Sequence, residues 1–112
     1  MMNLPILCIA IPTFNRSNFL NVLLDSIINS IQNLDQKNVK YIEVIISNNS
    51  SSDDTLIVIE KYSEIFDNYN LSYKFFNQKK NIGFDSNYLF CLKNASAKYV
   101  HIIGDDDCLS SN

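Results

Sequence analysis

Residues 6–11 of the chain read ILCIAI, and Pro12 follows them directly. An unbroken apolar run of this length is typical of a strand that is buried on both faces of a sheet. Proline has no backbone N–H to offer to a neighbouring strand, so Pro12 is expected to stop the run. We therefore predict a buried first strand over residues 6–11.

The segments after this strand alternate between the helical and the strand pattern. Residues 16–34 carry apolar side chains at three- and four-residue steps, which predicts an amphipathic helix capped by Ser17 or Asn18. Further strands are expected over residues 41–47, 71–77 and 99–104, and further helices over residues 55–67 and 84–95. The apolar positions that mark the three helices are Leu20, Leu24, Ile27, Ile31 and Leu34, then Val58, Tyr62, Ile65 and Phe66, then Phe84, Tyr88, Cys91, Leu92 and Ala95.

The predicted order βαβαβαβ indicates an α/β fold with a mostly parallel sheet and helices on both of its faces. Crossovers between parallel strands are right-handed, and ligands of open sheets bind beyond the carboxyl ends of the strands. If the first and fourth strands are neighbours and the strand order is 3-2-1-4, the ends of the first, second and fourth strands line one crevice. The 112 residues suit a single domain, residues 1–112.

Composition excludes several classes of protein. A hydrophobic content of 46% is that of a globular chain, and a net charge of −3 argues against nucleic-acid binding. Cys8, Cys91 and Cys108 form no CxxC pair, so neither a zinc site nor a disulfide framework is indicated, and reduced thiols in the cytoplasm are expected. The apolar stretch at the start has the features of a strand and lacks those of a signal peptide, and no segment reaches the roughly 20 apolar residues of a membrane span.

Polar residues gather where three of the predicted strands end. Pro12, Thr13, Phe14 and Asn15 follow the first strand, Asn48 and Asn49 the second, and Asp105, Asp106 and Asp107 the fourth. An aromatic face, an amide edge and a group of carboxylates match the base of a nucleoside diphosphate and a divalent cation that bridges its phosphates. A cation would also relieve the repulsion among three adjacent carboxylates.

Structural explanations of the same residues stay open. The aspartates are also compatible with a solvated loop or a helix cap, Phe14 with a core position, and the two asparagines with a turn. Residues 51–54 are interpreted as the N-terminal cap of the second helix, where carboxylates are favoured. Arg16, Lys79 and Lys80 would suit phosphate groups, but solvent-facing charge is the simpler explanation. Gly83 is expected to shape the turn into the third helix.

Several motifs together resemble family-2 glycosyltransferases of the GT-A fold. The matches are IPTFNR (11–16), ISNNSSSDDT (46–55) and NIGFDSNYLFCLKNASAKYVHIIGDDD (81–107), in this order and spacing. The resemblance extends over nearly the whole chain, and it is to the N-terminal, Rossmann-like nucleotide-binding half of the bacterial enzymes that build surface polysaccharides. The resemblance implies a Mn²⁺- or Mg²⁺-dependent transfer of a sugar from a nucleotide diphosphate sugar to an acceptor hydroxyl.

The resemblance also implies roles for individual residues. Pro12, Thr13, Phe14, Asn15, Asn48, Asn49 and Gly83 would bind the donor together with Asp105 and Asp106, and the metal would be held by Asp106 and Asp107. Asn48 stands where the family usually has an acidic residue that reads the base. Because an amide offers both an acceptor and donors, it can pair with the edge of uracil or thymine, so a UDP- or dTDP-sugar is expected.

The same resemblance leads to expectations about activity and partners. The general base of an inverting transferase and the acceptor site lie downstream of the aspartates in the family, so the 112 residues are expected to bind donor without transferring sugar. The acceptor would be a saccharide or a lipid-linked saccharide, and the place of action the cytoplasm or the inner face of its membrane. An exposed sheet edge beside the fourth strand predicts a homodimer.

Two other functions stay open on the sequence alone. One is a transferase-like interaction module without catalytic activity, which would lack metal-dependent nucleotide binding. The other is a nucleotidyltransferase, which shares the layout and the metal. The latter would carry a glycine-rich, basic loop after the first strand, and PTFNRSN (12–18) has no glycine.

Overall fold

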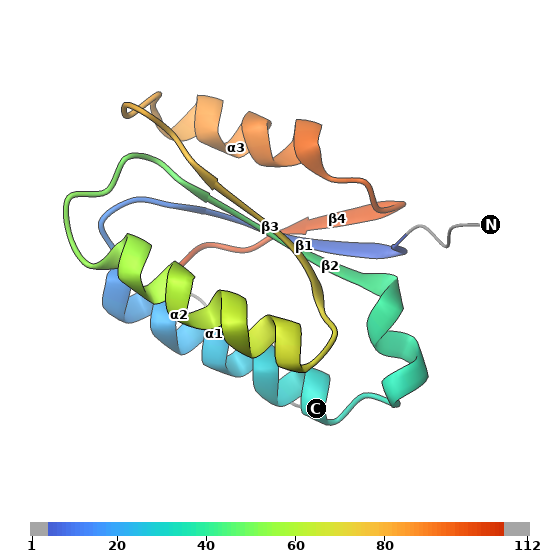
Figure 1. The fold of residues 1–112 in the computed structure, drawn as a ribbon. Helices are drawn as coiled ribbons and strands as arrows, with labels where there is room; N and C mark the ends of the chain where they lie inside the picture. Colours follow the sequence, from blue (N-terminus) through green and yellow to red (C-terminus); the bar gives the residue numbers. More distant parts are fainter. Residues whose placement is uncertain (1–4, 107–112) are drawn as a thin grey trace.

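The structure is a computed structural model that describes residues 5–106. Seven main elements follow one another in the predicted alternation (Figure 1). They are β1 (Leu7–Thr13), α1 (Ser17–Gln32), β2 (Ile42–Asn48), α2 (Thr55–Asn68), β3 (Ser72–Asn77), α3 (Phe84–Asn94) and β4 (Tyr99–Ile102). The only unpredicted element among these residues is a short 3-10 helix over Gln36–Tyr41, which begins where Asp35 accepts a hydrogen bond from the backbone N–H of Lys37.

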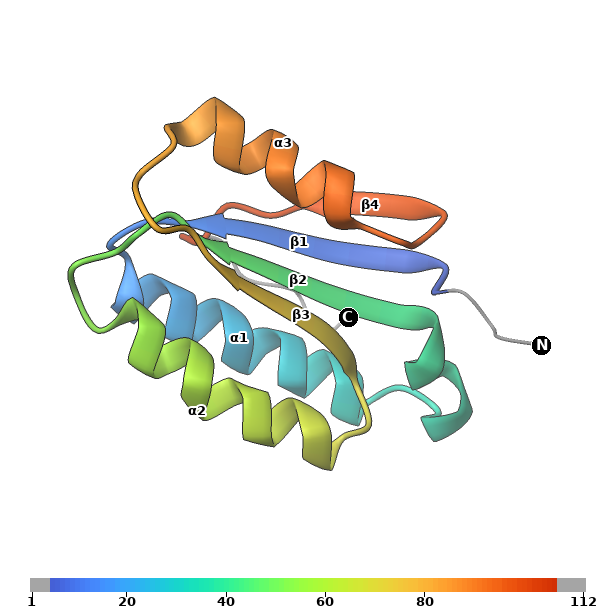
Figure 2. The same cartoon turned by 45° about the horizontal axis from the view of Figure 1, so that its top comes forward.

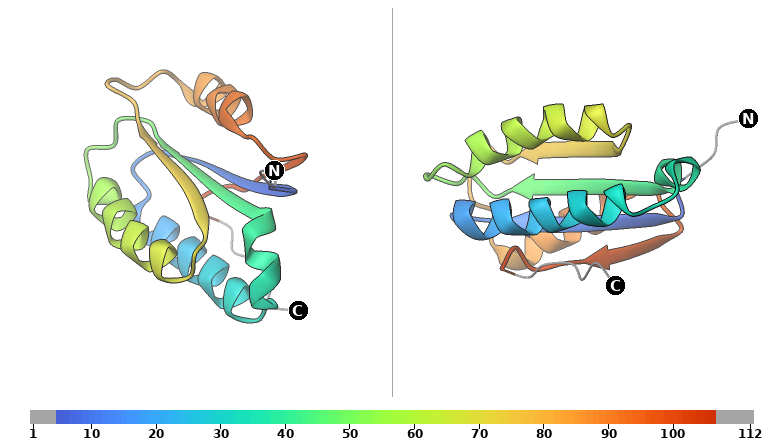
Figure 3. Two further views of the ribbon diagram at one scale, coloured as in Figure 1. Left: turned by 45° about the vertical axis from the view of Figure 1, so that its right-hand side comes forward. Right: turned by 90° about the horizontal axis from the view of Figure 1, so that it is seen from below.

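The four strands form one parallel sheet in the order β3-β2-β1-β4, as the sequence predicts. β1 pairs with β2 over its whole length, from Leu7 opposite Ile42 to Thr13 opposite Asn48. All four strands point the same way, so their carboxyl ends lie at one edge of the sheet (Figure 3). α1 and α2 lie side by side on one face and α3 covers the other, which confirms the predicted α/β layers (Figure 2).

Pro12 lies within β1 rather than beyond it, so the prediction that it ends the strand was wrong. The carbonyl of Ala10 accepts from Ile103 N, and the carbonyl of Thr13 accepts from Asn49 N. Because backbone groups of a strand alternate between its two neighbours, Pro12 faces the β4 side. The pairing of β1 with β4 ends at Ala10, so the missing N–H of Pro12 removes no sheet hydrogen bond.

The core is thick beneath α1 and α2 and thin beneath α3. The first side buries the apolar stripe of α1 and the aromatic side chains of α2, Tyr62 and Phe66, against β1 and β2. The second is built around Cys8, Ala10, Ile45 and Cys91. Both of these thiols are free, and burial raises their pKa, to about 12 for Cys8 and about 11 for Cys91.

The apolar pattern of α3 was a poor guide to its buried face. Phe84 is 73% exposed and Leu92 39% exposed, whereas Asn87 and Cys91 are the buried residues of this helix. Leu34, predicted to lie on the buried face of α1, follows the end of that helix and is also exposed. None of the helices within residues 5–106 has the length and apolar character needed to span a membrane.

Candidate functional site

A cleft of about 760 Å³ opens between the carboxyl ends of the strands and the start of α3. The turn after β1, the residue that follows β2 and the segment after β4 form its floor, and the loop before α3 and the first turns of that helix form its roof. The lining residues are Pro12, Thr13, Phe14, Arg16, Asn49, Asn81, Gly83, Phe84, Asn87, Tyr88, Ile102, Gly104, Asp105 and Asp106. Of the predicted donor-binding residues, only Asn15 and Asn48 do not line it.

Thr13 joins the three strand ends of the cleft floor. Its hydroxyl donates to Asp105 Oδ2 at 2.8 Å in a buried contact, and its carbonyl accepts from Asn49 N at 2.9 Å. Phe14 follows it, lines the cleft and is 42% exposed. The turn after β1 therefore offers an aromatic surface on a support that is fixed from both sides.

Asn15 holds the turn after β1 against the loop after β2. Its backbone φ of 51° lies in the left-handed region, which asparagine tolerates better than most residues. Its Oδ1 accepts from Ser52 N at 2.7 Å and Asp53 N at 3.3 Å, and its own N–H donates to Ser51 Oγ at 2.9 Å. Asn15 thus shapes the cleft wall from outside the cleft.

Asp53 caps two helices at once. One oxygen accepts from Thr55 N at 2.9 Å at the start of α2, and the other accepts from Ser17 N at 3.2 Å at the start of α1. Neither Ser17 nor Asn18 caps α1, because Ser17 is already its first residue and no side chain of the turn reaches its N-terminus. Burial pushes the pKa of Asp53 up, but the hydrogen bonds from Thr55 and Ser17 outweigh it and hold that pKa below its usual value.

The two asparagines after β2 have different surroundings, although both are 3% exposed. Asn48 Oδ1 accepts from Ser51 N and Oγ, at 3.2 and 2.6 Å, and its Nδ2 donates to Asn77 Oδ1 at 3.2 Å. Asn48 is therefore engaged on both sides of its amide.

Asn49 instead organises the loop before α3. Its Oδ1 accepts from Ile82 N at 2.8 Å, and its Nδ2 donates to Asn81 Oδ1 at 3.1 Å and to the carbonyl of Gly83 at 3.3 Å. Because Asn49 also lines the cleft, one amide connects the end of β2 to the cleft roof.

The start of α3 supplies side chains that the sequence pattern placed differently. Gly83 has φ 88° and ψ 159°, a conformation that is essentially restricted to glycine. It turns the chain so that Phe84 stands exposed at the cleft and contacts Tyr88, with ring centroids 6.4 Å apart. Asn87 is 2% exposed; its Nδ2 donates to the carbonyl of Ser47 at 3.0 Å, and its Oδ1 accepts from Ser47 Oγ at 2.6 Å. In the sequence, the position of Asn87 four residues before Cys91, and so on the same side of the helix, was the signal that it is buried.

The carboxylates after β4 form the acidic end of the cleft. Asp105 is 8% exposed and accepts from Thr13 Oγ1, while Asp106 is exposed. Arg16 reaches both, with Nε 3.6 Å from Asp105 Oδ1 and a terminal guanidinium nitrogen 3.7 Å from Asp106 Oδ2. Burial raises the pKa of Asp105 above its usual value, and the charge of Asp106 adds to this, although Thr13, Arg16 and the N–H of Phe14 lower it.

The residues around the acidic end fit a divalent cation. Asp107, predicted as a metal ligand, lies outside the described residues, and residues 5–106 contain no group of three or more His, Cys, Asp or Glu side chains that could hold an ion. Hard cations such as Mg²⁺ and Mn²⁺ need only one or two carboxylates when substrate phosphates complete their coordination. Arg16 contacts both carboxylates, but Asp105 is buried and also engaged by Thr13 and Phe14, so the exposed Asp106 is the described carboxylate that is more open to an ion.

The chain belongs to glycosyltransferase family 2, because the family described as Glycosyl transferase family 2 matches residues 8–112. A relative from Campylobacter jejuni, the GalNAc(5)-diNAcBac-PP-undecaprenol beta-1,3-glucosyltransferase, is 39% identical over 108 residues, which are 96% of this chain and 32% of the relative. The chain thus spans about a third of the length of that enzyme.

Two solved structures have the same fold. TarS residues 1–349 of S. aureus in complex with UDP align with a TM-score of 0.76 and 24% identity over 95% of this chain and 29% of that one. The mannosyltransferase PcManGT of Pyrobaculum calidifontis in complex with GDP-Man and Mn²⁺ aligns with a TM-score of 0.78 and 20% identity, over 96% and 29%. At this level of identity the likeness shows the fold, and it confirms the predicted GT-A arrangement.

Proposed function

We propose that the chain forms the donor-binding unit of a metal-dependent transferase. It would serve the transfer of a sugar from a nucleotide diphosphate sugar to an acceptor hydroxyl in polysaccharide or lipopolysaccharide synthesis. The observation that carries the proposal is the single cleft in which Phe14, Asn49 and the pair Asp105–Asp106 meet from three strand ends. Family membership supports it, as does the activity named for the Campylobacter relative, which acts on an undecaprenol-linked saccharide.

The base of the donor would stack on Phe14. The ring is exposed and firmly supported, and stacking on an aromatic face is worth about 1–3 kcal/mol per base. Asn48 would read the edge of the base only if its amide gave up Ser51 or Asn77. A UDP- or dTDP-sugar stays our prediction; among the structural neighbours TarS binds UDP and PcManGT binds GDP-Man.

The diphosphate would lie at the acidic end of the cleft. Asp106, together with Asp107, would hold Mn²⁺ or Mg²⁺, and Asp105 would fix the turn through Thr13 and contact the sugar or ribose. A bound cation supplies a Lewis acid that stabilises the charge on the leaving diphosphate. The chain's own residues orient the donor, through the ring of Phe14 at one end and the carboxylates at the other.

We propose that the transfer inverts the configuration at the sugar. Inversion at the sugar requires a base for the acceptor hydroxyl. Apart from Asp105 and Asp106, the cleft walls within residues 5–106 carry no acidic side chain and no histidine, so the described residues supply no obvious candidate. We propose that the 112-residue chain binds donor without transferring it, and that the acceptor is a saccharide or a lipid-linked saccharide at the cytoplasmic face of a membrane.

Nucleotide-dependent stabilisation tests the proposal directly. The melting temperature of the purified chain would be measured with UDP, dTDP, GDP and CDP, each with and without Mn²⁺. We expect a rise that requires both nucleotide and Mn²⁺ and is largest for UDP or dTDP, because only the folded state binds them. Asp106→Asn should abolish the rise, whereas Glu64→Gln, the same chemical change on the exposed side of α2, should keep it.

Each other outcome has a definite meaning. A largest shift with GDP would contradict the predicted base. No Mn²⁺-dependent shift with any nucleotide would contradict the transferase proposal and favour an interaction module without donor binding. Transfer of sugar from a UDP-sugar to any acceptor by the 112-residue chain would contradict the proposal that this chain only binds the donor.

A further inference from the structure

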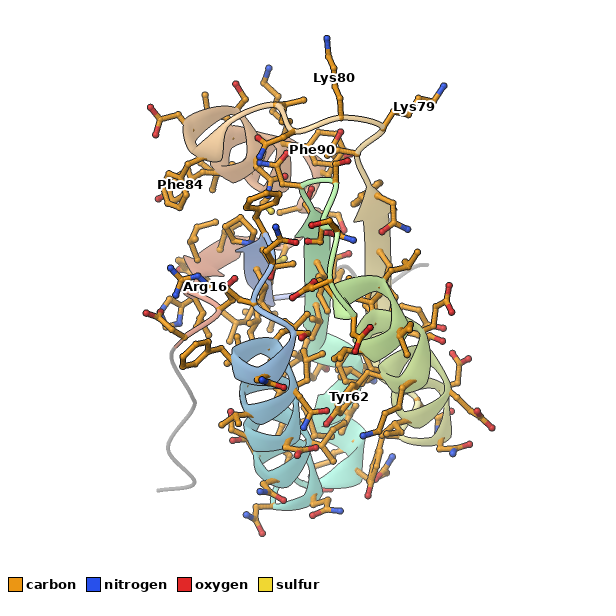
Figure 4. All side chains as sticks on the ribbon, turned by 90° about the vertical axis from the view of Figure 1, so that its left-hand side faces the viewer. Arg16, Tyr62, Lys79, Lys80, Phe84 and Phe90 are labelled. Atoms are coloured by element: carbon orange, nitrogen blue, oxygen red, sulfur yellow. The ribbon has the colours of Figure 1, made fainter. Side chains whose placement is uncertain are left out.

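Arg16 is the only basic side chain among the residues that line the cleft, all of which lie within the described part of the chain. It extends from the turn after β1 to the end of β4, where its guanidinium lies between two carboxylates (Figure 4). Lys79 and Lys80 point away from the cleft in the same view. One cation is thus placed where two adjacent negative charges, Asp105 and Asp106, would otherwise repel each other.

The ion pairs of Arg16 are weak enough for its guanidinium to leave the two carboxylates for another partner. Its nitrogens lie 3.6 and 3.7 Å from the two carboxylates, longer than the 2.7–2.9 Å or so of a strong charge-assisted hydrogen bond. The side chain is 49% exposed, and ion pairs open to solvent contribute little to stability. The rest of its support is the ring of Phe19, whose centroid is 5.9 Å from Cζ. Arg16 therefore neutralises the pair without being fixed to it.

We propose that Arg16 is an exchangeable counter-ion of the donor site. Before the donor binds, its guanidinium balances Asp105 and Asp106. When a divalent cation binds at Asp106, the guanidinium is repelled and moves to the diphosphate, whose oxygens suit its planar fork of donors. This inference rests on the proposed function and assigns a positioning residue to it.

Such an exchange has opposite effects on two binding steps. While Arg16 is present, it competes with a free divalent cation for Asp106, so its removal should tighten the binding of the cation alone. Once the diphosphate is present, Arg16 becomes one of its ligands, so its removal should weaken the binding of nucleotide. A residue with a merely structural role would shift both affinities in the same direction or neither.

The test measures both steps separately in wild type, Arg16→Met, Arg16→Lys and the control Lys80→Met. Binding of Mn²⁺ alone is followed by the electron paramagnetic resonance signal of the free ion, and binding of UDP and GDP at saturating Mn²⁺ by calorimetry. Both are done at one ionic strength, because screening alters every charge contact. For Arg16→Met we expect Mn²⁺ to bind about threefold to tenfold tighter and the nucleotide about tenfold weaker, in line with the size of single charge contacts.

The variants separate the outcomes. Arg16→Lys keeps the charge and should bind Mn²⁺ like wild type while losing part of the nucleotide affinity, and Lys80→Met should change neither. Equal or weaker Mn²⁺ binding by a folded Arg16→Met chain, shown by an unchanged circular dichroism spectrum, would overturn the inference. If wild type binds Mn²⁺ but neither nucleotide, the proposed function fails, while the Mn²⁺ arm still decides whether Arg16 competes for Asp106.

Discussion

Thr13 and Asp105 are 92 residues apart in the chain, yet their side chains form a buried hydrogen bond at the centre of the cleft floor. The bond gives the carboxylate one of its few donors and ties the ends of β1 and β4 together. Which aspartate would be buried did not follow from the sequence, because three identical residues in a row differ only in how the chain turns after β4. The sequence located the acidic site and left its internal roles open.

Replacing Thr13 by valine should measure this contact. Valine keeps the shape of the side chain and removes the hydroxyl, which leaves a buried acceptor with fewer donors. We expect the free energy of unfolding to fall by about 1–3 kcal/mol, the usual cost of such a group. Urea denaturation would give the value, and Thr13→Ser, which keeps the hydroxyl, should lose clearly less. A Thr13→Ser chain that loses as much stability as Thr13→Val, although it keeps the hydroxyl, would contradict the assigned role of the hydrogen bond.

Glu43 provides a pH-dependent contribution away from the cleft. It is 2% exposed and accepts from Ser96 N at 3.1 Å and Ser96 Oγ at 2.7 Å, with Lys74 Nζ at 3.4 Å. Burial raises the pKa of Glu43, but Ser96, Lys74 and Cys8 together lower it below the usual value. Because the folded pKa lies below the unfolded one, the ionised group stabilises the fold above about pH 4.3, and this stabilisation is lost as the pH falls through the folded pKa.

Glu43→Gln should therefore act in a pH-dependent manner. At pH 7 we expect a loss of about 1–3 kcal/mol in the free energy of unfolding, since the neutral amide pairs poorly with Ser96 and Lys74. At pH 3 the difference from wild type should shrink. Denaturation curves of both proteins at the two pH values provide the comparison, and a difference that does not change with pH would contradict the assignment.

At the scale of single elements, strands were easier to predict than the buried face of α3. β1 and β2 are buried on both sides, so their composition alone marks them. In α3 the exposed aromatic Phe84 lies at the cleft, and a buried asparagine replaces the expected apolar contact. Helical periodicity assigns apolar and aromatic residues to the core. It therefore cannot identify an aromatic residue such as Phe84 that is exposed at a binding surface.

The shared cap of α1 and α2 gives a prediction at this scale. Asp53→Ala removes a side-chain cap that both helices share, so the loss should exceed that of an ordinary cap, which is about 1 kcal/mol. Asp54, its neighbour, occupies the N-cap position of α2 without making a side-chain cap bond and is the matched control. Asp54→Ala should stay within about 0.5 kcal/mol. Thermal unfolding of both variants is the measurement, and similar losses would argue against the double cap.

For the whole molecule, alternation of helices and strands predicted the class of fold but did not by itself specify the strand order. The order 3-2-1-4 was predicted on the assumption that the first and fourth strands are neighbours, and the structure confirms it. The contacts that seal the cleft could not be predicted in the same way. They join residues such as Asn49 and Asn81, whose pairing depends on the path of a loop.

The position of β4 at the edge of the described sheet gives a prediction about association. Tyr99 is 58% exposed there, and unpaired strand edges recruit other strands. We expect a dimer whose fraction rises with protein concentration in analytical ultracentrifugation. Tyr99→Lys should weaken it by placing a charge at the edge, while Tyr99→Phe should not. A single monomeric species over a hundredfold concentration range would rule out this association.

The hydrogen bonds between the two turns that follow β1 and β2 have a mechanical consequence. The hydrogen bonds of Asn15 and Asp53 join these two turns, so this side of the cleft is preorganised before a ligand binds. Binding would therefore require little further ordering of that side of the cleft. The opposite side, where Arg16 makes only long contacts with Asp105 and Asp106, is then the part that can rearrange. Its rearrangement would control the rates at which a ligand binds and dissociates.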